Sequence, residues 1–310
     1  RTKSAVALIS NAIAEKRLDL AEEANNLAEK VLTATGVKVK ASDRAGADKG
    51  SAATEYLIFI ANREVEQLAD IAIAAFDEGK DPSKLKKEVA AVFHGKQAID
   101  IACFGRMLAD APDLNTDASA QVAHAFSIDQ ITPEYDYFTA VDDCASDDNA
   151  GAAMIDTVGF NSSTLYRYAT LNVDALRDQL QDADAMVEGV SAFVEAFVKS
   201  MPSGKQNTFA NHTLPEDIVI VLRDSQPISA ADAFENPIKR KDGISVSRQG
   251  IERLGDRLNE IRINYGEEPV KAWHVVSGGS VPSLDEWSEQ VTLPELEQSL
   301  RETLSAAYSA

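Results

Sequence analysis

Two neighbouring groups of side chains in the middle of the sequence have types that could act on a nucleic acid. Tyr137, Phe138 and Val141 are followed by Ile155 across a stretch of small and acidic residues. Apolar wedges and aromatic rings of this kind can separate bases or stack on them without regard to base sequence. An ordinary β-hairpin core explains the same residues, and the pattern alone favours that explanation by about three to one.

The acidic residues Asp142, Asp143, Asp147 and Asp148 form a cluster directly after the aromatic run. Clustered carboxylates can hold magnesium for phosphodiester cleavage, which makes a metal-dependent nuclease one hypothesis. Acids at a hairpin tip also commonly keep it soluble or pair with a neighbouring subunit, and we weigh this interpretation above catalysis. We therefore expect no enzyme activity, no bound metal and no cofactor.

Lysine side chains form a further set of candidates. Lys84, Lys86, Lys87 and Lys96 are the densest basic cluster in the N-terminal helical region. Near a helix start such cations gain nothing from the helix dipole, so their placement favours a role in guiding phosphates. A solvated charge run is the alternative.

Three other sites could contact a nucleic-acid backbone. Lys205, Gln206 and Asn207 follow a helix end and a glycine, where they could contact phosphate or sugar, or form a solvated loop. Arg106 suits a phosphate or, equally, a structural ion pair. Arg167 lies between two tyrosines and is a weaker candidate, because strand alternation could place it on the face away from the ligand.

Composition limits the class of protein. The chain has 310 residues, 45% hydrophobic and 26% charged, as in soluble globular proteins. Its net charge of −20 argues against indiscriminate nucleic-acid binding, so any such site must be a local groove. Without a signal peptide or a membrane-length apolar run, we expect a cytoplasmic protein with no membrane partner. Because the chain opens at Arg1 without a methionine, we also expect a segment to be missing before it.

The spacing of apolar residues predicts helices in the first hundred residues and mixed elements after them. The expected helices cover residues 4–32, 56–76, 82–92, 172–200, 246–263 and 294–307, with a linker at 35–50.

Strands are expected where β-branched and aromatic residues gather. The expected strands lie within residues 120–131, 135–141, 163–171, 218–222 and 272–276. The acidic tip between the second and third of these predicts a projecting hairpin. Helices that cross a sheet of a few strands indicate the α+β class.

Several ordered motifs in the sequence resemble one known protein family. They lie at residues 100–107, 121–126, 136–143, 157–169, 202–207, 212–215 and 226–235. In this order and at compatible spacing they are similar to the CasC family, the repeated backbone subunit of the type I-E CRISPR Cascade complex. The resemblance covers most of the chain.

The resemblance implies a hand-like α+β fold. Its palm would be a modified RNA-recognition, or ferredoxin-like, domain with a large helical fingers insertion and a β-hairpin thumb. The fingers would cover residues 1–110, a palm strand region 111–133, the thumb 134–168, and the rest of the palm with the C-terminal helices 169–310. The family's first palm strand is not in this sequence, and residues 127–129, 156 and 159 depart from the family pattern.

The resemblance also implies function and partners. Such subunits stack head to tail along a guide RNA (crRNA) in an antiviral ribonucleoprotein, beside other Cascade subunits, and support hybridisation of target DNA. A metal-dependent RNA-cleaving relative is the first alternative, and a helical scaffold protein without nucleic acid is the second.

The family's site residues can be carried onto matching positions. The resemblance favours the thumb interpretation of the hairpin, and Met107 would help to sandwich a displaced nucleotide. The expected RNA-binding residues are Arg106, Met107, Tyr137, Phe138, Val141, Ile155, Arg167, Lys205, Gln206 and Asn207. The expected DNA-binding residues are Lys84, Lys86, Lys87 and Lys96.

Overall fold

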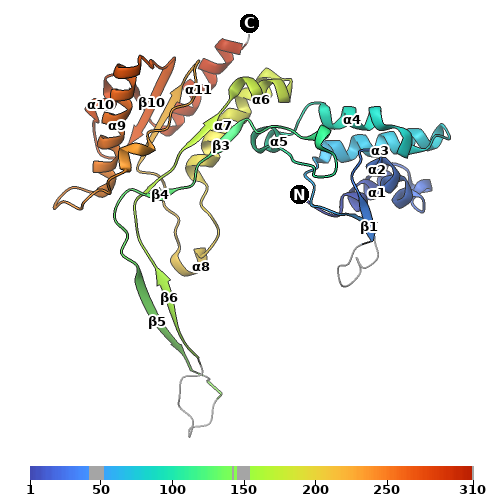
Figure 1. Ribbon diagram of the computed structural model, residues 1–310, viewed down its shortest axis with the longest axis horizontal. Coiled ribbons are helices and arrows are strands. Elements are labelled where there is room, and N and C mark those ends of the chain that lie inside the picture. The colour runs from blue at the N-terminus through green and yellow to red at the C-terminus, as the bar shows by residue number, and fades with distance from the viewer. Residues whose placement is uncertain (42–51, 142, 145–153, 309–310) are drawn as a thin grey trace. The chain divides into compact units, whose positions relative to one another are not determined.

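The computed structural model describes residues 1–41, 52–141, 143–144 and 154–308. The chain divides into two compact units, which can be followed by residue number in Figure 1. Unit 1 comprises Arg1–Gln121, Thr170–Phe193 and Arg301–Ala310, and unit 2 comprises Val122–Ala169 and Val194–Leu300. Helices and small sheets occur together, which confirms the expected α+β class.

The core of unit 1 is helical, because apolar residues recur there at three- and four-residue spacing. Helices α1 (Ala5–Lys16), α2 (Ala24–Thr33), α3 (Asn62–Asp77) and α4 (Lys86–His94) all bury apolar side chains in one cluster. The prediction that the first hundred residues are mainly helical is therefore confirmed.

The expected single helix over residues 4–32 is wrong, because the chain leaves the helical conformation at Arg17. Its φ of −141° ends α1, and a short 3-10 helix, Leu18–Leu20, turns the chain before α2 begins. The Arg17 guanidinium forms ion pairs with Asp19 (2.8 Å) and Asp77 (3.1 Å) at this turn. The apolar spacing continues across the break because both helices bury their apolar sides in the same core.

The segment expected to be a linker contributes to a short hairpin instead. Strand β1 (Val39–Ala41) pairs antiparallel with β2 (Ala52–Thr54). Helix α3 begins at Asn62, later than its apolar pattern, because Ile58 forms a backbone bridge to Thr2 and keeps the preceding residues out of the helix.

Unit 2 contains a three-stranded sheet in the order β11-β10-β9. Strand β9 (Asp217–Leu222) runs antiparallel to β10 (Lys271–Val276), and β10 pairs in parallel with β11 (Glu289–Gln290). The first two strands confirm the expected strands at 218–222 and 272–276.

Helices α9 (Val246–Tyr265) and α10 (Pro282–Asp285) contribute apolar side chains to the core beside this sheet. Gly255 lets the two helices approach closely, since a Cβ atom there would lie 2.6 Å from Ser283 Oγ. Any larger residue at this position would push α10 away from α9.

The remaining described elements connect these parts. They are α5 (Ile99–Phe104), α6 (Val173–Leu180), α7 (Ala183–Lys199), α8 (Gln206–Phe209), α11 (Leu293–Tyr308), β3 (Ala120–Val122), β8 (Ala169–Leu171) and the 3-10 helices Pro82–Lys84, Pro112–Leu114 and Ala231–Phe234. The expected helix over 172–200 is two helices, because Gln181 adopts a left-handed conformation (φ 50°) between α6 and α7.

A two-stranded hairpin extends from unit 2 (Figure 1). Strand β5 (Glu134–Ala140) pairs antiparallel with β6 (Met154–Phe160). The expectation that residues 163–171 form the second arm is wrong. Those residues form β7 (Leu165–Tyr166), which pairs with β4 (Phe126–Ser127) at the root of the hairpin, and β8.

Candidate nucleic-acid interface

The hairpin presents two chemically different faces. Residues paired across two strands point to the same side, and successive residues point to opposite sides. The pairs Tyr135 with Gly159, Tyr137 with Thr157 and Thr139 with Ile155 therefore define one side, which we call the tyrosine face. The pairs Asp136 with Val158 and Phe138 with Asp156, together with Phe160, define the other side, the phenylalanine face.

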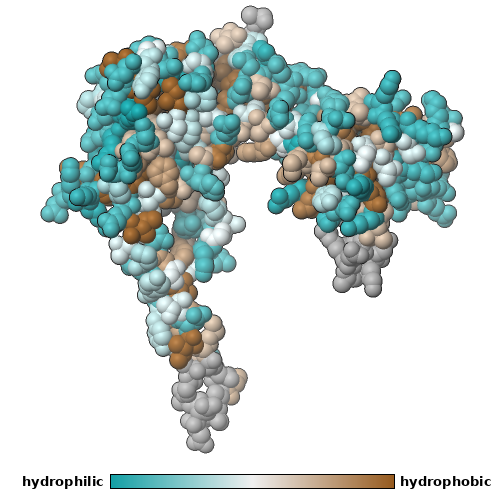
Figure 2. Space-filling view, viewed as in Figure 1, coloured by the Kyte–Doolittle hydropathy of each residue, from teal (hydrophilic) through white to brown (hydrophobic). Residues whose placement is uncertain are grey.

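The tyrosine face is bare. Tyr135, Tyr137 and Ile155 are 73%, 64% and 59% exposed, which is unusual for large apolar side chains gathered on one short strand pair. Figure 2 shows hydrophobic side chains at the surface of the hairpin. An arm with this surface is suited to contact a partner that brings flat apolar groups of its own.

The predicted wedge of Tyr137, Phe138, Val141 and Ile155 is not one surface. Phe138 is half-buried and lies on the phenylalanine face, opposite Tyr137 and Ile155, while Val141 is exposed just beyond the last paired residue of β5. Tyr135 belongs to the tyrosine face and was missed. Strict alternation along the strand was the signal in the sequence that could have separated these residues.

The phenylalanine face borders a pocket formed with the short helix α8. The rings of Phe160 and Phe209 lie 6.0 Å apart, centroid to centroid, with an interplanar angle of 41°. Beside them is an open cavity of about 530 Å³. Its lining consists of Tyr135, Asp136, Phe138, Val158, Phe160, Thr208 and Phe209.

The backbone at both ends of α8 is in a left-handed conformation that non-glycine residues rarely adopt. Lys205 has φ 62° at its start and Ala210 has φ 47° at its end. Each such residue costs about 1 kcal/mol or more of conformational energy. The turn is held by backbone hydrogen bonds from the Phe209 N–H to the Lys205 carbonyl (3.0 Å) and from the Ala210 N–H to the Gln206 carbonyl (2.8 Å).

The three predicted contact residues at this helix are not equivalent. Lys205 and Asn207 are exposed. Gln206 is half-buried and its Nε2 donates a hydrogen bond to the Pro202 carbonyl (3.0 Å), so its side chain is used within the turn. Two of the three side chains therefore remain available to a ligand.

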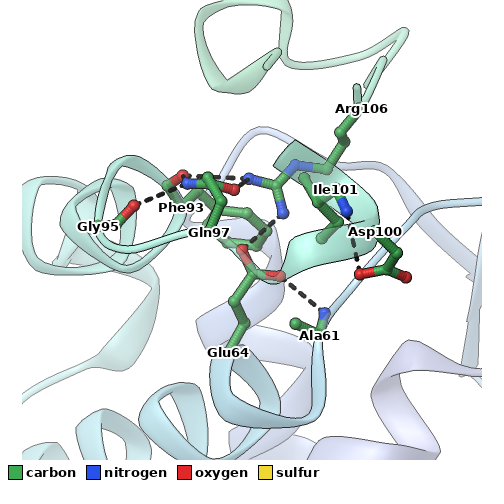
Figure 3. Close-up of polar contacts among 8 residues, drawn as sticks. All are labelled: Ala61, Glu64, Phe93, Gly95, Gln97, Asp100, Ile101 and Arg106. Carbon is green, nitrogen blue, oxygen red and sulfur yellow. Dashed lines mark hydrogen bonds and ion pairs between the residues drawn. The ribbon is translucent and has the colours of Figure 1, made fainter. Parts of the chain in front are cut away.

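Arg106, predicted as an RNA contact with an ion pair as the alternative, is a structural residue. Its side chain is fully buried, and its Nη1 lies 2.6 Å from Glu64 Oε1 (Figure 3). Its Nη2 donates to the Phe93 carbonyl (3.1 Å) and to Gln97 Oε1 (3.2 Å), and the guanidinium lies over the Phe93 ring at 4.8 Å. Glu64 Oε2 in turn accepts the N–H of Ala61, the residue before α3. We therefore correct the assignment, because no phosphate reaches this guanidinium.

The other two single-residue predictions differ in accessibility. Met107, next to Arg106 in unit 1, is exposed. Arg167 in unit 2 is half-buried, lies over the Phe197 ring at 4.4 Å and donates to the Ser200 carbonyl at 3.5 Å. Met107 is free to contact a ligand, whereas most of the Arg167 guanidinium is used within its own unit.

The lysine cluster is exposed, as its predicted role requires. Lys84 ends a 3-10 helix, and Lys86 and Lys87 occupy the first turn of α4. Among the described residues these three form no ion pair, whereas Lys96 lies 3.6 Å from Asp182. The cluster therefore contains three unpaired cations and one paired cation.

The acidic cluster is largely outside the described residues. Asp142, Asp147 and Asp148 fall there, and Asp143 is exposed. Within the described part of the chain, no group of three or more His, Cys, Asp or Glu side chains is arranged to hold a metal ion. No helix within the same residues is long and apolar enough to span a membrane.

One polar cluster was not predicted from the sequence. His274 on β10 is fully buried, with Nδ1 2.8 Å from Ser288 Oγ and Nε2 3.1 Å from Asp285 Oδ1. Burial lowers the pKa of His274, although Asp285 opposes this effect. The Ser288 hydroxyl donates to the Leu284 carbonyl. A ring without solvent access cannot meet a substrate, so we interpret this cluster as structural.

Comparisons with known proteins relate the whole chain to one group. It is similar to a chain of a solved structure described as a CRISPR RNA-guided surveillance complex, pre-nicking, with a TM-score of 0.81 and 27% identity over 99% of this chain and 84% of that chain. A chain of a second CRISPR RNA-guided surveillance complex matches with a TM-score of 0.60 and 31% identity over 68% of this chain and 78% of that chain. No curated protein matches the chain.

The match to a family model is nearly complete along the sequence. The model of the CT1975-like proteins, a Cas family, matches residues 1–299. Together with the structural similarities, this match confirms the resemblance to a Cascade backbone subunit that the ordered motifs indicated. The chain therefore belongs to the CT1975-like family of Cas proteins.

Proposed function

We propose that this chain is a backbone subunit of a CRISPR RNA-guided surveillance complex, which binds the guide RNA and has no enzyme activity. Its family and its similarity to chains of two such complexes support this function. The observation that carries RNA binding is the tyrosine face of the hairpin. Tyr135, Tyr137 and Ile155 are exposed there, and side chains of these types stack on bases or wedge between them.

Head-to-tail assembly along the guide RNA is the second part of the proposal. A projecting arm with a bare apolar face supports a heterologous contact, in which the arm of one copy meets a different surface of the next copy. Such a contact continues until the RNA ends, so RNA length sets the number of copies. The sheet of β9, β10 and β11, with α9 beside it, supports a palm of the RNA-recognition, ferredoxin-like type.

Support of target DNA is the third part. Lys84, Lys86 and Lys87 are exposed and form no ion pair among the described residues, so their charge is available to phosphates. The chain as a whole has a net charge of −20, which makes an unpaired basic cluster the more informative.

The hairpin part is tested by replacing Tyr137 and Ile155 together with alanine. The double variant is expected to lose co-purifying RNA of defined length while keeping the circular dichroism spectrum of the folded chain, because both side chains are exposed. A matched control replaces Ile263 and Tyr265 with alanine, since these residues of α9 are 63% and 74% exposed and lie outside the hairpin. Equal RNA retention by the two double variants would refute RNA binding by the tyrosine face.

The non-enzymatic part needs a separate test, because the acidic tip leaves an RNA-cleaving relative as the alternative. Assembled particles are incubated with magnesium and an RNA complementary to the guide. We expect the RNA to remain intact. Regularly spaced cuts that disappear in an Asp142→Ala variant would overturn the non-enzymatic proposal.

A further inference from the structure

The pocket between the phenylalanine face and α8 has the dimensions and lining of a small-ligand site. Its volume of about 530 Å³ falls in the range that small-molecule sites occupy. Four of its lining residues carry aromatic rings: Tyr135, Phe138, Phe160 and Phe209. Rings from two separate elements, the hairpin and α8, therefore border one space.

The chemistry of the lining favours a base over a phosphate. Asp136 is the charged member among the described residues that line the pocket, and its carboxylate repels a phosphate. The aromatic rings offer flat apolar surfaces, on which any base can stack. The Thr208 hydroxyl and the Asp136 carboxylate add hydrogen-bonding groups for the polar edge of a base.

The surroundings favour a nucleic acid over a protein side chain. Lys205 is exposed at the start of α8, four residues before Phe209, and Asn207 is exposed between them. A strand whose base enters the pocket has its own phosphates to place, and a cation beside the pocket suits them. The aromatic side chain of a protein partner brings no such negative charge.

The backbone strain at α8 fits the same interpretation. Left-handed non-glycine residues at both ends of a four-residue helix raise the conformational energy of the turn. The turn they bracket is the one that brings Phe209 to Phe160. Strain of this kind gathers where a backbone must hold a ligand-binding side chain.

We propose that this pocket receives one unstacked base of the bound RNA, with the base stacked on Phe209 and Phe160 and a neighbouring phosphate at Lys205. The inference rests on the proposed function, since it names the part of the RNA that the phenylalanine face takes. The hairpin then contacts the RNA on both sides. The tyrosine face meets one stretch of bases and the phenylalanine face encloses a single displaced base.

The experiment uses the full chain and single-stranded RNAs of guide length, each with one abasic site at a successive position. In the wild-type complex, an abasic site at the enclosed position should weaken binding about tenfold, because the stacking of one base is removed. The Phe209→Ala variant should bind unmodified RNA about tenfold more weakly and show no additional weakening at that position. A Phe209→Trp variant should retain the wild-type pattern.

The matched control is Phe104→Ala. Phe104 is also an exposed phenylalanine with a second ring nearby, 6.3 Å from Phe193 at an angle of 44°, but it lies in unit 1 outside the pocket. Its variant should bind like the wild type. Circular dichroism of all variants, including Phe209→Leu, separates removal of the ring from unfolding of the chain.

The outcomes distinguish the two proposals. If the wild type binds RNA and Phe209→Ala has the same affinity and the same abasic profile, the pocket does not take a base and the proposed function survives. If the wild type binds no RNA, the proposed function itself fails. If Phe209→Ala keeps its RNA affinity but no longer assembles with other copies, the pocket receives a protein side chain and the inference is overturned.

Discussion

Two regions of this chain use residue types against expectation, and in opposite directions. In unit 1 the charged guanidinium of Arg106 is fully buried, between Glu64 and Phe93. In unit 2 the apolar side chains of Tyr137 and Ile155 stand in solvent on the hairpin. Arg106 has its partners inside its own fold, whereas the hairpin residues have theirs elsewhere. What distinguishes a structural residue from a candidate site is where its partners are, not its type.

The largest expected effect tests the buried side of this comparison. Arg106→Ala leaves the Glu64 carboxylate buried without its cation, and should lower the free energy of unfolding of unit 1 by about 3–5 kcal/mol. Both tryptophans, Trp273 and Trp287, lie in unit 2. In urea denaturation, the helical circular dichroism signal should therefore lose stability while the tryptophan fluorescence transition stays in place.

Two further variants sharpen this test. Replacing Glu64 and Arg106 together with methionine should cost less than Arg106→Ala, because no unpaired charge remains. Arg177→Ala removes an exposed arginine that pairs with Asp178, and should change stability far less. If Arg106→Ala left unfolding unchanged and abolished RNA binding, Arg106 would again have to be assigned as an RNA-binding residue.

The same contrast shows how far the sequence reached. Apolar spacing found the helical core of unit 1 and the strand β5, because burial of one stripe or face is a local signal. It missed the Arg106 ion pair, because Glu64 lies 42 residues away and only folding brings them together. It also missed α8, since a single strained turn has no periodicity, and with it the approach of Phe209 to Phe160.

The next effect compares the two faces of the hairpin. Phe138 is half-buried on the phenylalanine face, so Phe138→Ala should destabilise the hairpin by about 1.5 kcal/mol. Tyr137→Ala on the opposite face removes an exposed ring, so its effect should stay within about 0.5 kcal/mol. Hydrogen exchange of the β5 and β6 amides measures both, since it reports local opening. Equally reduced protection in both variants would mean that the faces are not different.

An intermediate case is a carboxylate that is half-buried and has no ion pair among the described residues. Burial, and then the neighbouring charge of Glu216, raise the pKa of Asp217 to about 6. A raised pKa in the folded chain means that the neutral form is favoured. Stability from this group is therefore complete below about pH 4 and is lost as the pH rises through about 6.

Asp217→Asn should remove this pH dependence. At pH 7.5 the variant should be more stable than the wild type by about 1 kcal/mol, a value reduced for the partial exposure of the carboxyl group. At pH 4 the two proteins should unfold at nearly the same urea concentration. Fluorescence of Trp273 on the neighbouring strand β10 measures the transition. The exposed residue Asp242 provides the control, and an equal gain from Asp242→Asn would assign the effect to net charge.

The smallest expected change in stability belongs to the exposed cations. Replacing Lys84, Lys86 and Lys87 with glutamine should leave unfolding unchanged, because these side chains form no ion pair among the described residues. The variant should instead bind target duplex DNA more weakly, with a salt dependence shallower by about 0.9 for each phosphate that a lysine no longer neutralises. Lys96→Gln is the matched control, because Asp182 already neutralises that charge in part, and its slope should change less. An unchanged slope in the triple variant, with guide RNA retained, would show that an unpaired exposed cation can be as idle as a paired one, and would remove the lysine cluster from the DNA-binding surface.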